Sequence, residues 1–315
     1  MSVRFGVVMD PIADIKPHKD TTLALLIEAQ HRGWALCYLE MGDLYLRDGV
    51  AWGRWRELSV SQDTHTWYSL GEAFETPLHE LDAIFMRKDP PFDTEYLMAT
   101  YILERAQLDG AHVFNHPRAL RDINEKIYTA WFPQCCVPML VTREMARIKA
   151  FLNTHQDIII KPLTLMGGAS VFRVRQNDAN VNVICELMTQ HETQYTMVQR
   201  YIPDVTVGDK RILLIDGEPY PYALARIPAP GETRANMAVG GKGVCQPLTE
   251  RDHWICQQVG PHLRERGLLF VGLDVIGDYL TEINVTSPTG IRELEAQRGD
   301  NIAARVLDRL VEKIS

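Results

Sequence analysis

The sequence predicts an α/β protein with an N-terminal α/β domain, a small α+β lid and a larger C-terminal domain. Strand-like and helix-like segments alternate along the first 124 residues, which is typical of an α/β unit. From about Asn124 onward the pattern changes to that of a small α+β unit, and an acidic hairpin with helical segments then marks a larger one. The expected domains are residues 1–124, 125–203 and 204–315.

The N-terminal domain is predicted from apolar runs that alternate with helical periodicity. The expected strands are 5–9, 35–39, 81–86 and 112–114, and the expected helices are 21–32 and 94–108. A dinucleotide-binding fold is disfavoured, because Asp10-Pro11 stands after the first strand where that fold needs a glycine-rich turn. Arg87, Lys88 and Asp89 end a strand where open α/β sheets bind ligands, although an exposed loop can carry the same charges.

The predicted lid contains a glycine hairpin. A β-branched run at 158–160 leads into Lys161, Gly167-Gly168 follow, and residues 171–175 alternate again. A Walker loop would open a helix here, whereas a period of two predicts a second strand. Adjacent glycines let backbone N–H groups approach phosphates, and Lys161 supplies a positive charge for them. An ordinary hairpin with a solvated lysine has the same pattern.

The C-terminal domain contains the most informative stretch, residues 274–284, which reads as two short strands joined by a Gly-Asp turn. Glu282 and Asn284 are two apart and therefore share one face of a strand, and a tight hairpin brings Asp274 close to them. Three oxygen donors around one point suit Mg²⁺, which implies ATP-dependent chemistry. An acidic hairpin can also show this spacing without binding a metal.

A long loop is expected from residue 226 to residue 243, because the segment contains two prolines and four glycines. Arg226, Arg234 and Lys242 outnumber the single acidic residue, Glu232, as in a loop that closes over anionic substrates. A surface linker is the alternative interpretation.

A hydroxyl-rich turn follows the acidic hairpin. Ser287, Pro288 and Thr289 precede a stretch with helical character. A turn and helix N-terminus in this place could present hydrogen-bond donors to a carboxylate.

Composition limits the classes of function. The 315 residues carry a formal net charge of −8, with 46% hydrophobic and 23% charged residues, which argues against a general nucleic-acid or anionic-membrane binder. No apolar run approaches the roughly 18 residues of a membrane span, and the N-terminus lacks signal-peptide features. The six cysteines include no Cys-x-x-Cys pair, which predicts reduced thiols in the cytoplasm.

Together, these segments resemble the ATP-grasp superfamily and, within it, the prokaryotic glutathione synthetase family. The resemblance covers nearly the whole chain, and the order and spacing of its segments make it specific. The matching segments are Phe5–Ile12, Glu40–Tyr45, Met86–Glu95, Leu120–Lys126, Lys161 with its glycine loop, Gly208–Arg211, Gly272–Asp274 and Thr281–Thr289.

The resemblance implies a role for each candidate residue. Lys126 and Lys161 would hold the α- and β-phosphates of ATP, and Arg211 and Arg226 would stabilise an acyl phosphate and the oxyanion formed from it. The remaining nucleotide contacts would come from Gly167, Gly168, Ser170, Gln199, Tyr201 and Asp209. The metal ligands would be Asp274, Glu282 and Asn284, with one or two Mg²⁺ ions that Mn²⁺ can replace. The substrate contacts would be Arg211, Arg226, Arg234, Ser287, Pro288 and Thr289.

The expected reaction is an ATP-driven ligation of a carboxylate to an amine. The residues themselves indicate only this class of chemistry on anionic small molecules. The resemblance supplies the substrates, γ-glutamylcysteine and glycine, and implies a homotetramer. Two alternatives remain open: a related ligase with a different amine acceptor, and a non-catalytic ATP-binding module, which would be expected to lack part of the metal set or the arginines.

Overall fold

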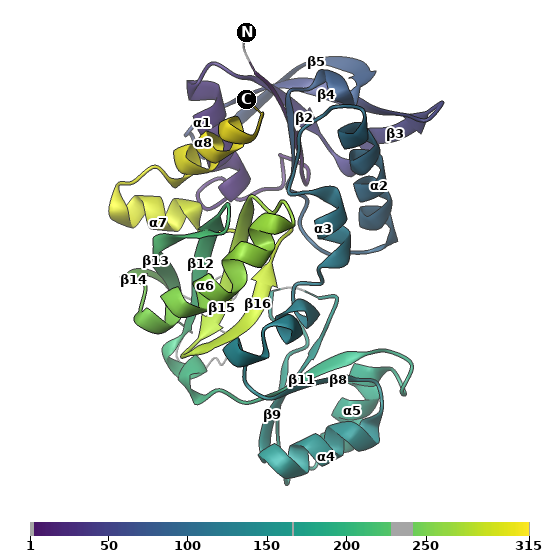
Figure 1. The fold of residues 1–315 in the computed structure, drawn as a ribbon, viewed down its shortest axis with the longest axis vertical. Helices are drawn as coiled ribbons and strands as arrows, with labels where there is room; N and C mark the ends of the chain where they lie inside the picture. Colours follow the sequence, from purple (N-terminus) through teal and green to yellow (C-terminus); the bar gives the residue numbers. More distant parts are fainter. Residues whose placement is uncertain (1–2, 166, 228–241, 315) are drawn as a thin grey trace.

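The computed structural model describes residues 3–165, 167–227 and 242–314, and within them the strands form three sheets. Figure 1 shows the first sheet and its helices at the top, the lid at the bottom and the C-terminal sheet between them. The mixed α/β class with a separate lid is therefore confirmed. None of the described helices has the length and apolar character needed to cross a membrane.

The first sheet has a parallel centre and an antiparallel extension. Its strand order is β3-β4-β2-β1-β6-β7, with β5 paired to the free side of β4. Its strands are β1 (Arg4–Val8), β2 (Ala35–Leu39), β3 (Leu44–Arg47), β4 (Val50–Val60), β5 (Tyr68–Pro77), β6 (Ala83–Met86) and β7 (Val113–Phe114). Its helices are α1 (Thr21–His31), α2 (Thr94–Leu108) and α3 (Pro117–Asp122).

The predicted N-terminal elements are confirmed to within two residues at their ends, but β3, β4 and β5 were not predicted. In β4 the buried positions are first Ala51, Gly53 and Trp55 and then, beyond a register shift, Leu58 and Val60. These strands pair antiparallel with β2 and with each other, so their pairing does not follow the strand–helix alternation that predicted the rest of the domain.

The lid is a four-stranded antiparallel sheet backed by two helices, with the order β10-β9-β11-β8. Its small core, which includes Ile158, Ile160 and Val198, is separate from the cores of the rest of the molecule. Its elements are β8 (Met139–Thr142), α4 (Met145–His155), β9 (Asp157–Pro162), β10 (Phe172–Arg175), α5 (Val181–Thr189) and β11 (Thr196–Arg200).

The C-terminal sheet is antiparallel, with the order β14-β13-β12-β15-β16. Its last two strands are joined by Gly277-Asp278, as the sequence predicts, and Gly277 has a φ of 55°. The strands are β12 (Asp209–Ile215), β13 (Glu218–Ile227), β14 (Lys242–Pro247), β15 (Phe270–Ile276) and β16 (Tyr279–Asn284). The helices are α6 (Glu250–Glu265), α7 (Ile291–Arg298) and α8 (Ile302–Ile314).

The C-terminal helices return to the N-terminal domain. Figure 1 shows α8 beside α1, and the same apolar cluster contains Leu26 of α1 and Leu307 of α8. Asn115 joins the two parts by hydrogen bonds, because its Nδ2 donates to the carbonyls of Phe270 and Val285 and its Oδ1 accepts from the Phe270 N–H. The N-terminal domain and the C-terminal sheet thus share their cores, and the lid does not.

Candidate active site

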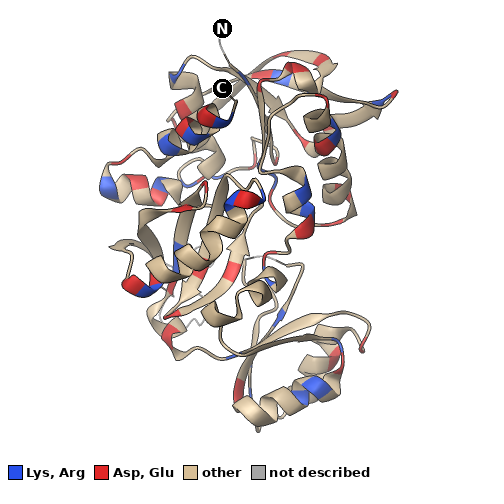
Figure 2. Cartoon of the chain, in the orientation of Figure 1, with Lys and Arg blue, Asp and Glu red and all other residues tan. Residues whose placement is uncertain are grey.

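A cavity of about 250 Å³ lies between the lid and the C-terminal sheet, and most of the predicted site residues line it. The strands of this sheet carry both positive and negative residues, as Figure 2 shows, whereas the core positions of a sheet are usually apolar. The predicted residues on its walls are Lys126, Lys161, Gly167, Gly168, Gln199, Tyr201, Asp209, Arg211, Arg226, Asp274, Glu282 and Asn284.

Two buried lysines enter this cavity from the lid side. Lys161 is the penultimate residue of strand β9, and its Nζ donates to the carbonyl of Thr281 at 3.1 Å. Lys126 Nζ donates to the carbonyl of Leu165 at 2.6 Å and contacts Glu282 Oε1 at 2.8 Å. Burial, and then the neighbouring Lys126, lower the pKa of Lys161 to about 8, although Glu282 acts in the opposite direction. Both ammonium groups therefore have little water around them and gain from an anionic ligand.

The glycine loop has the predicted hairpin geometry. Strand β9 pairs antiparallel with β10, and the loop connects them. Gly167 and Gly168 have φ angles of 70° and 74°, a region that side chains rarely adopt, so glycine is required for this backbone path. Ser170, with a φ of 56°, continues the turn but does not line the cavity.

The predicted metal ligands come together on two paired strands. Asp274 lies directly opposite Glu282, and Asn284 lies opposite Gly272. Asn284 Nδ2 donates to the Gly272 carbonyl at 3.1 Å, which leaves its Oδ1 for a ligand. Among the described residues, no three His, Cys, Asp or Glu side chains converge on one point. The ligands of a cation here would therefore be two carboxylates, Asp274 and Glu282, and the amide oxygen of Asn284. This all-oxygen set fits Mg²⁺.

Two arginines surround Asp274. Arg211 donates to both of its oxygens, from Nε at 2.5 Å and from Nη2 at 2.9 Å, and Arg226 Nη2 contacts Oδ2 at 2.9 Å. Burial would raise the pKa of Asp274, but the two guanidinium groups hold it well below its ordinary value. The carboxylate is therefore ionised, and Oδ1, to which Arg211 Nε donates, keeps a further lone pair for a cation.

The ends of the predicted long loop are strand rather than loop. Arg226 pairs with Gly243 across β13 and β14, and Ile227 pairs with Lys242. Arg226 is 8% exposed and binds Asp209 through Nε and Nη2, each at 2.7 Å. Cross-strand pairing satisfies the backbone at both ends, which composition alone did not indicate. The residues between them, including Arg234, lie outside the described residues.

Gln199 and Tyr201 form one wall of the cavity near the end of β11. Gln199 is 5% exposed, and its Nε2 is buried without a partner among the described residues. Arg173 stacks over the Tyr201 ring at 3.5 Å. Apolar side chains that were not predicted from the sequence complete this wall: Ile159, Ile202, Val205 and Ile276. An unpaired amide donor beside apolar surfaces suits a purine base, and no sequence motif distinguished these apolar residues from core residues.

The turn at 287–289 lies outside this cavity but against the edge of the N-terminal sheet. Arg87, which follows β6 and is 2% exposed, donates from Nη2 to the Pro288 carbonyl at 2.9 Å, and Arg211 Nη1 donates to the Thr289 carbonyl at 3.3 Å. Ser287 hydrogen-bonds Asp89, whose pKa burial raises. The structure thus brings this turn together with the strand-end residues of the N-terminal domain, which the sequence analysis treated separately.

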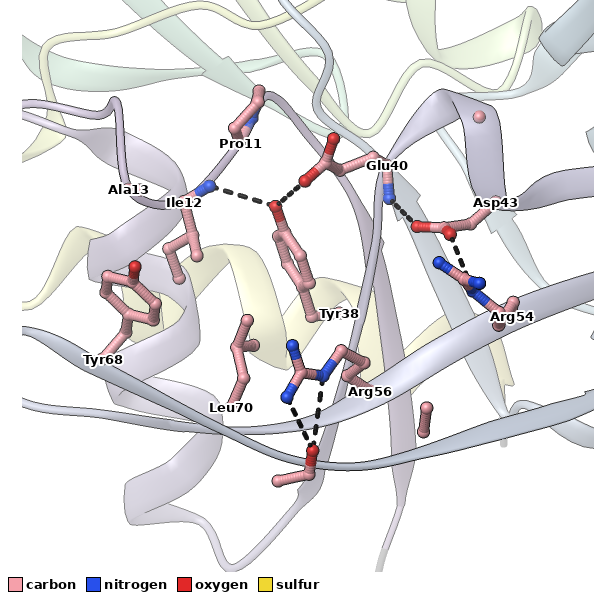
Figure 3. Close-up of a pocket in the computed structure, with 13 residues that line it drawn as sticks. Pro11, Ile12, Ala13, Tyr38, Glu40, Asp43, Arg54, Arg56, Tyr68 and Leu70 are labelled. Carbon is pink, nitrogen blue, oxygen red and sulfur yellow. Dashed lines mark hydrogen bonds and ion pairs between the residues drawn. The ribbon is translucent and has the colours of Figure 1, made fainter.

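A larger cavity, of about 550 Å³, lies on the N-terminal domain and contains none of the predicted site residues. Its polar groups bind one another, as Figure 3 shows: the Tyr38 hydroxyl donates to Glu40 at 2.6 Å, and Arg56 donates to the Gly71 carbonyl at 3.1 and 3.3 Å. Arg54 lies 3.5 Å from Asp43. Size alone therefore does not locate the site, whereas the converging charges of the smaller cavity do.

Comparison with known proteins agrees with this geometry. The family models for the N-terminal domain and the ATP-grasp domain of prokaryotic glutathione synthetase match residues 3–121 and 125–299. The chain is 57% identical over 315 residues to the glutathione synthetase of Pseudomonas aeruginosa, covering 100% of this chain and 99% of that protein.

Solved structures agree on the fold. D-cycloserine synthetase DcsG has a TM-score of 0.70 at 13% identity, covering 99% of this chain and 100% of that one. The ATP-grasp ligase PsnB, solved with a precursor variant, Mg and ADP, has a TM-score of 0.63 at 16% identity, covering 100% and 99%. At these identities the likeness concerns the fold alone, and the family follows from the matching models and the full-length relative. The chain belongs to the prokaryotic glutathione synthetase family of ATP-grasp ligases.

Proposed function

We propose that this ATP-dependent ligase joins γ-glutamylcysteine to glycine and releases glutathione, ADP and phosphate. The observation that carries the proposal is that Arg211, Arg226, Asp274 and Glu282 line the same cavity as the two lysines. Joining a carboxylate to an amine is uphill in water, and ATP drives it by converting the carboxylate to an acyl phosphate. This chemistry requires anion-binding groups and exclusion of water more than it requires a nucleophilic side chain.

In the first step the γ-phosphoryl group of ATP passes to the acyl carboxylate. Lys126 and Lys161 hold the phosphates, and the N–H groups of Gly167 and Gly168 approach them from above. The unpaired Nε2 of Gln199 donates to the adenine ring. Asp209 accepts from a ribose hydroxyl, and Ser170 completes the loop over the nucleotide.

In the second step the amine attacks the acyl phosphate, and negative charge develops on the former carboxyl oxygen. Arg211 and Arg226 stabilise this charge, since both guanidinium groups are buried and held in place by Asp274. Asp274, Glu282 and Asn284 would hold one or two divalent ions, either Mg²⁺ or Mn²⁺. Such an ion would neutralise phosphate charge and orient the transferring group.

The acyl substrate binds between the N-terminal domain and the C-terminal sheet, against the turn at 287–289. The buried Nη1 of Arg87 has no partner among the described residues, so a substrate carboxylate can pair with it. Ser287, Pro288 and Thr289 line the same side, and Arg234 contributes a further charge in the expected loop. With the expected domain limits of 1–124, 125–203 and 204–315, this substrate site would lie at the junction of the first and third domains.

The expected assembly is a homotetramer in the cytoplasm. The six cysteines are free, and five of them are buried, which agrees with a reducing compartment. The expected partners are the two small substrates, and neither nucleic acid nor a membrane is required.

The test is to measure phosphate release and product mass with Mg-ATP and γ-glutamylcysteine, with glycine present, absent or replaced by other amines. Glycine-dependent release with one glutathione per phosphate is the expected result. Turnover with a different amine would keep the ATP-dependent mechanism and overturn the substrate. Tight nucleotide binding without any turnover would indicate a binding module instead.

A further inference from the structure

Glu125 is a half-buried carboxylate that lines the cavity but takes no part in the two proposed steps. One of its oxygens, Oε1, accepts three hydrogen bonds: from the Val285 N–H at 2.9 Å, from the Thr286 N–H at 3.1 Å and from the Thr286 hydroxyl at 2.9 Å. Its backbone carbonyl also accepts from the Ile283 N–H at 2.8 Å. Hydrogen bonds to a charged acceptor are stronger than those between neutral groups. Together with the bond from Ile283, four donors hold Glu125 against the end of β16.

These contacts lie on both sides of a predicted metal ligand. Asn284 is between Ile283, which binds the Glu125 backbone, and Val285, which binds its side chain. Thr286 is 4% exposed and directly precedes the turn at 287–289. The position of Glu125 therefore fixes the direction in which the chain leaves β16 and enters the turn at 287–289.

The two neighbours of Glu125 reach the glycine loop instead. Asn124 Nδ2 donates to the Leu163 carbonyl at 2.9 Å, and Lys126 Nζ donates to the Leu165 carbonyl at 2.6 Å. The short segment 124–126 therefore contacts both the glycine loop and the segment that leads into the turn at 287–289. The connection between the two elements is thus only three residues long.

We propose that Glu125 is a positioning residue that couples nucleotide binding to binding of the acyl substrate. It holds residues 283–286 in one arrangement, so that an ordered glycine loop and an ordered 287–289 turn occur together. The inference rests on the proposed function, because it takes ATP and γ-glutamylcysteine as the two ligands. Coupling of this kind is a free-energy link between two sites, and it acts in both directions.

The test measures γ-glutamylcysteine affinity by calorimetry on the full chain, with and without the non-hydrolysable analogue AMPPNP and Mg²⁺. We expect AMPPNP to tighten peptide binding about tenfold in the unsubstituted protein, and Glu125→Ala to reduce this to less than about twofold. Glu125→Gln keeps one acceptor oxygen and is expected to retain part of the coupling. Thr286→Val removes one of the three bonds, and its effect should vanish when Glu125 is already alanine.

The matched control is Glu295→Gln. Glu295 also accepts from two backbone N–H groups, those of Ile302 and Ala303 at 2.8 and 3.0 Å, but it does so between α7 and α8, away from the cavity. We expect this variant to lose thermal stability without any loss of coupling. Equal loss of coupling in both variants would reduce Glu125 to a general structural residue and overturn the proposal.

The remaining outcomes are also decisive. If Glu125→Gln is as severe as Glu125→Ala and changes the Mg²⁺ requirement, the carboxylate acts directly on the metal, and the positioning role is wrong. If Glu125→Ala does not fold, the comparison of Glu125→Gln with Thr286→Val still tests the shared bond. If the unsubstituted chain binds AMPPNP but not γ-glutamylcysteine, the proposed substrate fails, and the inference fails with it. Unchanged coupling in every variant would leave the function intact and remove only the inference.

Discussion

At the scale of single residues, the site depends on charges that are held away from water. Lys161 and Lys126 are each 8% exposed, and Arg211 and Asp274 are 6% and 5% exposed. Each charge has an opposite charge or a backbone carbonyl nearby, so the residues are oriented before any ligand binds. Such preorganisation lowers the free energy of reorganisation during the reaction.

The lowered pKa of Lys161 predicts a pH-dependent affinity for ATP. Because its folded pKa is about 8, Lys161 loses its proton as the pH rises through that value, and bound phosphate favours the charged form. We expect ATP affinity to fall about tenfold between about pH 7 and pH 9, and binding near pH 9 to take up a proton. Calorimetry in buffers of different ionisation enthalpy measures both. Lys161→Arg, which stays charged, should remove the dependence, and a flat profile in the unsubstituted protein would contradict the assignment.

Glu282→Gln tests the proposed metal ligands. The substitution removes one of the two carboxylate charges among the proposed ligands while keeping the size of the side chain. We expect turnover at fixed Mg²⁺ to fall about 100-fold and the Mg²⁺ concentration for half-maximal rate to rise, because less phosphate charge is neutralised. The affinity for γ-glutamylcysteine should change less than about threefold. Glu265→Gln, at an exposed position at the end of α6, is the control, and equal turnover of the two variants would show that Glu282 is not a ligand.

At the scale of elements, two hairpins of similar geometry contribute different groups to the cavity. The β9–β10 hairpin places a glycine loop over the cavity, and the β15–β16 hairpin places carboxylates under it. Both were predicted, because a period of two on each side of a glycine turn is a local signal. Their meeting at one cavity is a property of the fold.

Gly168→Ala tests the glycine loop. Alanine at a φ of 74° is strained by about 1–2 kcal/mol, and we expect the loop to change its path and the KM for ATP to rise about tenfold. Gly49→Ala is a matched control, because Gly49 has a φ of 80°, nothing lies within 4 Å of its added Cβ, and it joins β3 to β4 away from the cavity. Both variants should lose similar stability in thermal melts. An unchanged KM in Gly168→Ala would remove the loop from the nucleotide site.

At the scale of the whole molecule, the N-terminal domain and the C-terminal sheet form one body, and the lid is separate. Their apolar clusters are continuous, and Asn115 connects them through three buried hydrogen bonds. The lid has its own small core. We therefore expect the substrate side of the site to be more rigid than the nucleotide side.

Asn115→Ala tests this connection. The substitution leaves three buried backbone groups, on Phe270 and Val285, without their partner, and we expect a loss of about 3 kcal/mol in the free energy of unfolding. The thermal midpoint should fall by roughly 5–10 °C. Asn153→Ala, at an exposed position of α4 in the lid, should change it by less than about 1 °C. Equal midpoints for the two variants would mean that the domains are held together by apolar packing alone.

The fold class, the two hairpins and most of the charged residues that line the cavity could be predicted from the sequence alone. This was possible because a strand's period, a glycine turn and the spacing of Glu282 and Asn284 are all local signals. The resemblance added Lys126, Gln199 and Asp209, which no local pattern would have distinguished. The antiparallel strands β3, β4 and β5 were missed, since their pairing does not follow the strand–helix alternation used for the rest of the domain.

The pairing of groups from distant parts of the chain depends on the tertiary packing. The bonds from Arg211 to Asp274 span 63 residues, those from Glu125 to Thr286 span 161, and those from Asn115 to Val285 span 170. The tertiary packing also places Arg226 in a strand against Asp209 rather than free in a loop. Such partnerships depend on how sheets and domains pack, and side-chain periodicity reports only the face of an element on which a residue lies, not the element that it meets.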